Sequence, residues 1–410
     1  MAYWQLSSLD LNQKMETLSG GQKMKVFLAG ILIHKPELIL LDEPGNHLDT
    51  DARQQLYKFI SETNSTLLIV SHDRKLLNFL NTIAELSSKG ITLYGGNYDF
   101  YAQQKQIENN ALEESVQSKE KALRKAKEKE RETMERQQRM DARGKGKQEK
   151  AGVARIMMNT LRNQAEHSSS KLKSAHAEKI THLSDELQYL RAAVPDIANM
   201  KLGFEDANLH KGKILFSATD INFTYDKQPL WKKPLSFEII SGERIALKGS
   251  NGSGKTSLIK IILGKLTPQT GSVYKANKQA IYIDQEYSLL DDKLTVYEQA
   301  QQYNTGALQE HEIKIRLTWF LFDKEHWNKP CKALSGGERM RLLLCCLTIS
   351  NTPPDIIVLD EPTNNLDIIN TEILTTAVNQ YKGTLIVVSH DAYFLEEIGI
   401  NRSIELLKLS

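Results

Sequence analysis

The residues best suited to chemistry begin with a glycine-rich stretch, Gly249-Ser-Asn-Gly-Ser-Gly-Lys-Thr256. It follows the apolar run 244–247 and precedes a helix-like stretch at 257–263. This setting predicts a phosphate-binding loop, because glycines let backbone N–H groups turn toward phosphate oxygens near a helix N-terminus. Lys255 would reach the β- and γ-phosphates of a nucleotide, and the Thr256 hydroxyl would bind Mg²⁺. Against the alternative of an ordinary surface turn, we expect nucleotide binding by Gly249, Ser250, Asn251, Gly252, Ser253, Gly254, Lys255, Thr256 and Ser257.

A pair of carboxylates, Asp360 and Glu361, follows the apolar, strand-like run 356–359. Nucleotides bind at the carboxyl ends of strands in doubly wound folds, so this position suits metal and water chemistry. Asp360 would hold Mg²⁺ through water, and Glu361 would act as the general base for the attacking water. Such a pair alone usually belongs to a solvated turn, but the phosphate-binding loop upstream favours the catalytic interpretation. Gln285, after the short strand 280–283, is a weaker candidate for binding Mg²⁺ or placing the water.

Two histidines, His72 and His390, each follow an apolar strand and precede an aspartate. A single histidine at a strand end is more often structural than catalytic. Because the context is repeated, we favour a role in sensing the γ-phosphate. Tyr225 precedes the glycine-rich loop and is a candidate for stacking on adenine, although tyrosine also packs in strands.

Three motifs occur twice in the chain, in the same order and at nearly the same spacing. They are LSGGQ at 18–22 with LSGGE at 334–338, LILLDEPGNHLD at 38–49 with IIVLDEPTNNLD at 356–367, and LLIVSHD at 67–73 with LIVVSHD at 385–391. An offset of about 316 to 318 residues preserved across three motifs indicates a duplicated domain.

The composition restricts the class of protein. The chain is 40% hydrophobic and 25% charged, with a formal net charge of +2, so any basic surface must be local. Its longest apolar runs are too short to span a bilayer, and we see no signal-peptide pattern. The three cysteines, Cys331, Cys345 and Cys346, suggest neither a disulfide framework nor a metal site. We therefore expect a cytoplasmic globular protein.

A charged segment lies between the two copies. Residues 103–143 are rich in Gln, Glu, Lys and Arg and contain no Gly or Pro, which predicts a helix of roughly 60 Å. We expect a break at 144–150, a second helix over 161–191 and a stop near Pro195. The simplest interpretation is a helical hairpin. A disordered linker is the alternative, which Leu183, Leu187 and Leu190 at helical spacing disfavour.

With these motifs the chain resembles the ATP-binding cassette (ABC) ATPases, whose signature loop is LSGGQ. More narrowly it resembles the ABC-F branch, in which two cassettes share one polypeptide with a charged helical linker and no transmembrane domain. The stretch 42–49 matches the branch's DEPxNHLD motif, with Gly45 where Thr is usual. The stretch 95–101 is similar to the GNYxxY motif that closes the first cassette.

The resemblance implies an α/β fold of two P-loop NTPase cassettes, the first incomplete, joined by a long helical hairpin. The implied boundaries are 1–95 for the first cassette, 96–200 for the linker and 212–410 for the second cassette. The cassettes of the family close over two ATPs, each lying between one P-loop and the other domain's signature loop. One site would join Tyr225, residues 249–257, Gln285, Asp360, Glu361 and His390 to Ser19, Gly20, Gly21 and Gln22. Asp49 and Asp367 would lie at the domain contact.

The other site departs from the family pattern, because no P-loop precedes Leu18. We expect a degenerate site of Asp42, Glu43 and His72 with Ser335, Gly336, Gly337 and Glu338, without a phosphate cradle. Loss of a central strand should expose a sheet edge and apolar surface. Three explanations compete, and we rank them in this order. The gene is truncated or its start is misassigned, a second chain supplies the missing part, or proteins of this lineage function with one site.

ABC-F members act on the ribosome, some in translation and some in protection against antibiotics, so the resemblance implies rRNA and tRNA as partners. A basic region near the hairpin tip would suit RNA through counterion release. The candidate RNA contacts are Arg143, Lys145, Lys147, Lys150 and Arg155. Two alternatives remain open: the ATPase component of a membrane transporter, and a DNA-structure-binding ABC ATPase. Both keep ATP and Mg²⁺ as substrate and cofactor.

Overall fold

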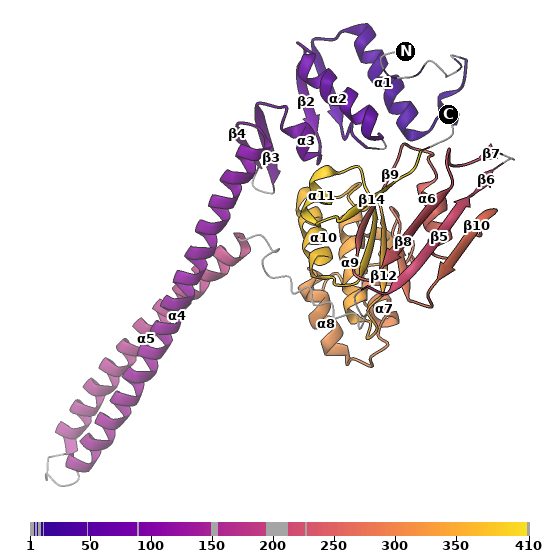
Figure 1. Ribbon diagram of the computed structural model, residues 1–410. Helices are drawn as coiled ribbons and strands as arrows, with labels where there is room; N and C mark the ends of the chain where they lie inside the picture. Colours follow the sequence, from indigo (N-terminus) through magenta and orange to yellow (C-terminus); the bar gives the residue numbers. More distant parts are fainter. Residues whose placement is uncertain are drawn as a thin grey trace. The chain divides into compact units, whose positions relative to one another are not determined.

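The computed structural model describes residues 4, 6, 10, 12–46, 48–87, 90–148, 155–193, 212–225 and 228–407, with backbone alone at 141–148, 155–169, 172, 192, 193 and 225. The chain forms two compact units, Met1–Tyr98 with Asn199–Ser410, and Asp99–Ala198. The first unit holds both copies of the repeated motifs and the second unit is helical (Figure 1).

A five-stranded parallel sheet forms the centre of the second copy, in the order β11-β12-β13-β9-β14. Its strands are β9 (Arg244–Lys248), β11 (Ala280–Ile283), β12 (Ile356–Asp360), β13 (Thr384–Val388) and β14 (Arg402–Glu405). The continuous apolar runs of β12 and β13 are buried on both faces, as expected for central parallel strands. The carboxyl ends of these strands therefore meet at one edge, where the candidate site residues follow them.

A smaller antiparallel sheet, in the order β10-β5-β8, shares a core with the central sheet. Its strands are β5 (Ile214–Asn222), β8 (Leu235–Ile240) and β10 (Thr270–Lys275), with the short pair β6 (Thr224–Tyr225) and β7 (Gln228–Pro229) nearby in sequence. Helix α6 (Lys255–Ile262) contributes Leu258, Ile259 and Ile262 to this core. Because α6 is held by the apolar core along its length, its N-terminus is fixed at the end of the glycine-rich loop.

The remaining helices of the second copy are α7 (Val296–Gln302), α8 (Glu310–Trp319), α9 (Gly336–Ile349), α10 (Ile368–Gln380) and α11 (Ala392–Glu397), with a 3₁₀ turn, η4 (Cys331–Ala333). Helix α9 begins with a capping box in which Ser335 and Glu338 satisfy each other's backbone N–H groups. The three cysteines are buried and free, in agreement with a packing role.

The first copy contains η2 (Met15–Thr17), α1 (Gly20–His34), β1 (Leu38–Asp42), α2 (Thr50–Glu62), β2 (Thr66–Val70), α3 (Arg74–Leu77), β3 (Thr82–Ser87) and β4 (Gly90–Gly95). Strands β1 and β2 pair in parallel, and β3 and β4 form an antiparallel hairpin. One face of the β1–β2 pair buries Ile39 and Leu41 in a core shared with Leu28 of α1 and with Leu56 and Ile60 of α2.

The opposite face of the β1–β2 pair is exposed and apolar, as the sequence predicts. The relative exposures are 54% for Leu38, 65% for Leu40, 60% for Leu68 and 56% for Val70. The equivalent residues of the second copy, Ile356, Val358, Ile386 and Val388, are exposed by at most 6%. There they pack against β9 and α6 within the shared core. The two copies therefore bury the same motif to different extents.

Side-chain contacts join the two copies within the first unit. Arg74 of α3 makes ion pairs with Glu397 of α11 at 2.8 Å and with Glu372 of α10 at 3.5 Å. The Asn78 amide donates a hydrogen bond to the Tyr393 hydroxyl at 3.2 Å. These contacts place α3 of the first copy against α10 and α11 of the second copy.

The helical unit is a pair of long helices, α4 (Tyr98–Gln148) and α5 (Arg155–Ala193) (Figure 1). Ion pairs of 2.6 Å between Lys119 and Glu186, and between Arg191 and Glu120, join the two helices. The predicted helical hairpin is therefore confirmed over the disordered alternative. Among the described residues, no helix is both long enough and apolar enough to cross a membrane.

Both helices are longer than the sequence predicted. Helix α4 continues through Gly144 to Gln148, although a break was expected from residue 144 onward, and α5 begins at Arg155 rather than near Leu161. A glycine costs only about 1 kcal/mol relative to alanine inside a helix, and the Lys, Arg and Gln residues around Gly144 are good helix formers. Helix α5 ends at Ala193, and Pro195 lies outside the described residues.

Candidate functional site

The glycine-rich loop connects β9 to α6 and places the first helical N–H groups at its open end. Gly249, Gly252 and Gly254 have φ values of 152°, 78° and 90°, in the region that favours glycine. A Cβ on Gly254 would lie 2.5 Å from Leu230 Cδ2 and 2.9 Å from Trp231 Nε1, so the backbone approaches too closely for any side chain. The loop therefore has the conformation that a phosphate cradle requires.

Lys255 lies in the cavity at the loop's open end. Its ammonium donates hydrogen bonds to the carbonyls of Gly249 at 2.7 Å and Ser250 at 3.3 Å. Burial lowers the pKa of Lys255, and the nearby carboxylates of Glu361 and Asp360 oppose this shift. A cation held against neutral carbonyls is free to turn toward a phosphate, which is a stronger hydrogen-bond partner.

The cavity has a volume of about 680 Å³, within the usual range for small-molecule sites. Its lining brings together three groups that are distant in sequence: the glycine-rich loop, the segment after β11 and the segment after β12. The lining residues are Leu230, Asn251, Gly252, Gly254, Lys255, Thr256, Ser257, Tyr282, Asp284, Gln285, Glu286, Asp360 and Glu361. Nine of the residues predicted for nucleotide binding, metal binding or catalysis in the second copy therefore line this cavity.

Asp360 and Glu361 lie where β12 ends. Burial raises the pKa of Asp360, and a hydrogen bond from the Tyr282 hydroxyl at 2.7 Å opposes the shift. Burial also raises the pKa of Glu361, to about 7, against the nearby cations of Arg53 and Lys255. Glu361 has a φ of 49°, an unusual conformation for a residue with a side chain and one that clusters at functional sites. A carboxylate with a pKa near neutrality suits a general base.

His390 faces Glu361 from the end of β13. Its Nε2 lies 3.3 Å from Glu361 Oε1, and Nε2 is buried without a hydrogen-bond partner. Burial lowers the pKa of His390 to about 4, and the cations of Lys255 and Arg53 lower it further. The ring is therefore neutral at physiological pH, with one nitrogen available at the carboxylate.

A divalent cation fits the oxygen atoms gathered in this cavity. Thr256, Gln285 and Asp360 all line it and offer a hydroxyl, an amide carbonyl and a carboxylate. Oxygen donors of this kind suit Mg²⁺, which also retains water and binds substrate phosphates. The backbone of Tyr225 lies in β6, but its side chain is outside the described residues.

The signature residues of the first copy do not line this cavity. Ser19 caps helix α1, where its hydroxyl accepts a hydrogen bond from the Gln22 N–H at 3.3 Å and its own N–H donates to Gln22 Oε1 at 2.9 Å. Gly20 and Gly21 form the first turn of that helix. In place of these residues, the start of α2 lies beside the glycine-rich loop. A second cavity, of about 460 Å³, is lined by Asp49, Thr50, Asp51, Lys248, Gly249, Ser250, Glu405, Leu406 and Leu407.

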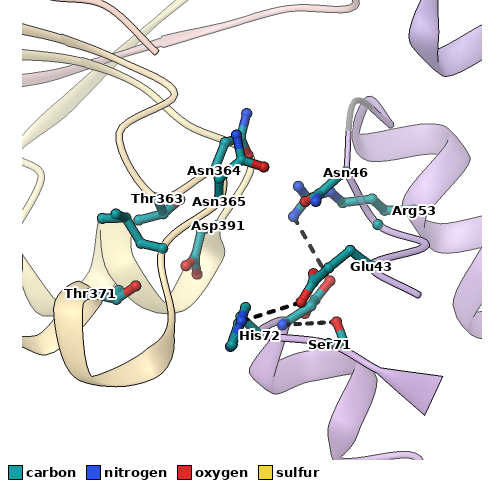
Figure 2. Close-up of a pocket in the computed structure, with 13 residues that line it drawn as sticks. Glu43, Asn46, Arg53, Ser71, His72, Thr363, Asn364, Asn365, Thr371 and Asp391 are labelled. Carbon is teal, nitrogen blue, oxygen red and sulfur yellow. Dashed lines mark hydrogen bonds and ion pairs between the residues drawn. The ribbon is translucent and has the colours of Figure 1, made fainter. Parts of the chain in front are cut away.

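The first copy repeats the carboxylate–histidine pair without a glycine-rich loop. His72 Nε2 lies 3.4 Å from Glu43 Oε1, and Glu43 has a φ of 45°. Figure 2 shows this pair facing Thr363, Asn364 and Asn365 across a small cavity of about 40 Å³. Burial raises the pKa of Glu43, and His72 opposes the shift.

The second copy's signature residues lie apart from this pair. Ser335, Gly336, Gly337 and Glu338 begin α9, and Glu338 is held by Lys329 at 2.9 Å. Gly336 lines a different cavity, with Gln285 and Arg339. Asp42 ends β1 and is not among the residues that line the small cavity. Within the described part of the chain, the residues predicted for the degenerate site are thus not gathered in one place.

Three residues near the site were missed by the sequence motifs. Tyr282 hydrogen-bonds Asp360, Arg53 contributes positive charge at Glu361, and Thr50 contacts His390 at 3.1 Å. The sequence could have indicated Tyr282, because it lies on the strand just before the predicted site residue Gln285. Nothing in the sequence indicated Arg53 and Thr50, since they belong to the first copy and the site belongs to the second.

The candidate RNA contacts near the hairpin tip fall where the structure describes no side chains. Lys150 lies outside the described residues. Arg143, Lys145, Lys147 and Arg155 belong to helices whose side chains are likewise not described there.

The sequence is similar to ATP-binding proteins of the ABC class. The family model for the ABC transporter ATP-binding domain matches residues 3–46 and 232–364. The chain is 33% identical to the ATP-binding protein Uup of Escherichia coli (strain K12), over 95% of this chain and 56% of that protein. It is 30% identical to the uncharacterized ABC transporter ATP-binding protein YfmM of Bacillus subtilis (strain 168), over 96% and 68% respectively.

Two further similarities extend over nearly the whole chain. ABC transporter F family member 5 of Arabidopsis thaliana is 30% identical over 97% of this chain and 52% of that protein. The solved complex of an archaeal ribosomal stalk protein with an archaeal ribosome recycling factor has a TM-score of 0.60 and 19% identity, covering 98% of this chain and 64% of that one. The chain spans about half to two thirds of the length of these relatives.

Proposed function

Because the chain belongs to the ABC-F branch of tandem ATP-binding cassette ATPases, we propose that it binds ATP with Mg²⁺ in the cavity above the glycine-rich loop and hydrolyses it. The observation that carries this proposal is the convergence of the loop, two carboxylates and Gln285 on one cavity. His390 completes the arrangement through its contact with Glu361.

Binding would rest on the backbone N–H groups of residues 249–257 and on the ammonium of Lys255. The N–H groups at the start of α6 favour negative charge at this position. Lys255 would exchange its two carbonyl contacts for phosphate oxygens. Bound Mg²⁺ would neutralise charge on the phosphates, and Thr256, Gln285 and Asp360 would hold it.

Hydrolysis would use Glu361 as the base for the attacking water. Its pKa near neutrality allows the ionised form to accept a proton at physiological pH. The neutral His390 would orient toward the γ-phosphate through Nε2, the ring nitrogen that has no hydrogen-bond partner. A bound nucleotide would itself displace competing water from the cavity.

We further propose that the ribosome is the partner, with the helical hairpin as the contacting element. Support comes from the ABC-F family and from the paired helices α4 and α5, which form an elongated helical unit of their own. This proposal includes a role in translation or in protection against antibiotics. It also includes contacts of the hairpin tip with rRNA and tRNA, and a cytoplasmic location.

Co-sedimentation with ribosomes tests the partner. The Glu361→Gln protein should pellet with ribosomes in the presence of ATP at near-physiological salt and stay in the supernatant without it. The double variant Lys255→Ala/Glu361→Gln, which lacks the phosphate-binding ammonium, is the matched control and should not pellet. If the Glu361→Gln protein binds ATP but remains in the supernatant, the ribosome proposal is wrong while nucleotide binding stands.

A further inference from the structure

We infer that Thr50, a residue of the first copy, is a positioning residue for His390 in the nucleotide site of the second copy. The inference rests on the proposed ATP hydrolysis and deepens it, because it assigns the first copy a part in that site. None of the motif residues of the first copy supplies this contact.

The contact is a hydrogen bond between Thr50 Oγ1 and His390 Nδ1, at 3.1 Å. Thr50 is the first residue of α2, directly after Asp49, whose carboxylate caps that helix by accepting from the Ala52 N–H at 3.0 Å. The cap fixes the start of the helix and hence the position of the hydroxyl. The His390 side chain is only 11% exposed, so few other partners can reach its ring.

The contact fits the tautomer of the neutral ring that carries its proton on Nε2. Nε2 of His390 lies 3.3 Å from a carboxylate oxygen of Glu361, and a carboxylate favours a proton on the nitrogen that faces it. Nδ1 then acts as the acceptor, and the Thr50 hydroxyl is the donor. The hydrogen bond made by one ring nitrogen determines what the other can do. Thr50 therefore holds Nε2–H toward the site where hydrolysis is proposed.

The repeat shows that this contact is specific to one site. The residue equivalent to Thr50 in the second copy is Ile368, which also follows the aspartate of the repeated motif and has no hydroxyl. The histidine that it would serve, His72, has no glycine-rich loop beside it. The hydroxyl is thus present only on the copy that lies against the complete site.

The start of α2 also lies beside the phosphate-binding loop. Asp49 and Thr50 line one cavity with Gly249 and Ser250. A conformational change of the loop on nucleotide binding would therefore displace the start of α2, which contacts His390. This arrangement couples the first copy to catalysis without using its signature loop.

Four variants of the full chain test the inference. Thr50→Val replaces the hydroxyl with a methyl group that also hinders water from reaching Nδ1. It should lower kcat about five- to tenfold with KM for ATP within about twofold, the effect of one lost hydrogen bond. Thr50→Ser should retain activity, and Thr50→Ala, which admits water, should be intermediate. Ile368→Val is the matched control at the equivalent position and should leave kcat unchanged.

The tautomer of His390 supplies a second reading that does not depend on turnover. Ring-nitrogen NMR of the ¹⁵N-histidine-labelled protein, assigned by comparison with His390→Gln, should show the proton on Nε2 in the parent protein and an altered distribution in Thr50→Val. An unchanged kcat together with an unchanged tautomer in Thr50→Val would overturn the inference. If the parent shows no ATPase above Lys255→Ala, the proposed hydrolysis fails, and the tautomer measurement alone still decides the role of Thr50.

Discussion

The Tyr282 hydroxyl donates a 2.7 Å hydrogen bond to Asp360 Oδ2, across two neighbouring strands of the central sheet. Tyr282 and Asp360 lie at the ends of β11 and β12, whose parallel register brings their side chains to the same edge. A hydrogen bond to a carboxylate favours its ionised form. Tyr282 thus opposes the burial that raises the pKa of the proposed Mg²⁺ ligand.

Removing this hydroxyl should weaken the use of Mg²⁺. Tyr282→Phe leaves the ring in place but removes a hydrogen bond to a charged group, so the Mg²⁺ concentration that gives half-maximal ATPase should rise about fivefold. ATP binding measured in EDTA should be unaffected. Tyr274→Phe, at an exposed position on β10, is the control and should match the parent. Equal Mg²⁺ titrations for Tyr282→Phe and the parent would contradict the assigned contact.

The two carboxylate–histidine pairs should differ in their importance for turnover. Glu361→Gln should lower kcat at least about 100-fold while ATP binding persists, because the base is lost and the cradle is intact. Glu43→Gln makes the same change in the first copy and should keep kcat within about twofold. A steady-state ATPase assay with a nucleotide-binding measurement separates the two effects. Hydrolysis by Glu361→Gln at the parent rate would show that Glu361 is not the base.

The raised pKa of Glu361 should make stability depend on pH. The carboxyl ionises near 4.5 when unfolded and at about 7 when buried, so the folded state binds the extra proton between these values. Stability from this group is therefore lost as pH rises from about 4.5 to 7, by an amount on the order of 2–3 kcal/mol.

Melting temperatures of the nucleotide-free protein in EDTA would measure this effect. Glu361→Gln cannot ionise, so it should melt several degrees above the parent at pH 8 and by a small margin at pH 5. Glu396→Gln, at an exposed position, should melt with the parent at both values. A constant difference between Glu361→Gln and the parent across this range would contradict the role of burial.

The exposed face of β1 and β2 should promote self-association. Leu40 and Leu68 are paired neighbours in the register and are 65% and 60% exposed. The double change Leu40→Thr/Leu68→Thr retains strand propensity and should reduce concentration-dependent light scattering without lowering the melting temperature. Ile39→Thr, on the buried face of the same strand, should instead lower stability by about 2–3 kcal/mol. If the double variant associates as strongly as the parent, another surface is responsible.

Most of the second copy's site could be predicted from the sequence, because its residues lie in short motifs with fixed local geometry. The glycine-rich loop needs only a strand before it and a helix after it, and Asp360 and Glu361 follow an evident buried strand. The sequence evidence for Gln285 as a site residue was weak. The structure supplies what the sequence lacked, because parallel pairing of β11 with β12 brings Gln285 to the same edge of the sheet.

The first copy's contribution to the site depends on contacts between distant segments. The sequence predicted Ser19–Gln22 as the first copy's contribution. In the structure, Thr50 contacts His390 and the positive charge of Arg53 acts on Glu361. No local spacing encodes which face of one domain meets the other. The helix limits failed for the opposite reason, since a glycine weakens a helix locally while its neighbours sustain it.

The order of the central sheet also has a consequence for synthesis. Strand β9, which leads into the phosphate-binding loop, pairs with β13 and β14, which begin at residues 384 and 402, about 140 to 160 residues later. At about 5–20 residues per second, β9 would wait on the order of 10 s for these partners to be translated. The nascent second copy should therefore acquire nucleotide binding late and in one step. During that interval its apolar central strand would be a natural target for chaperones.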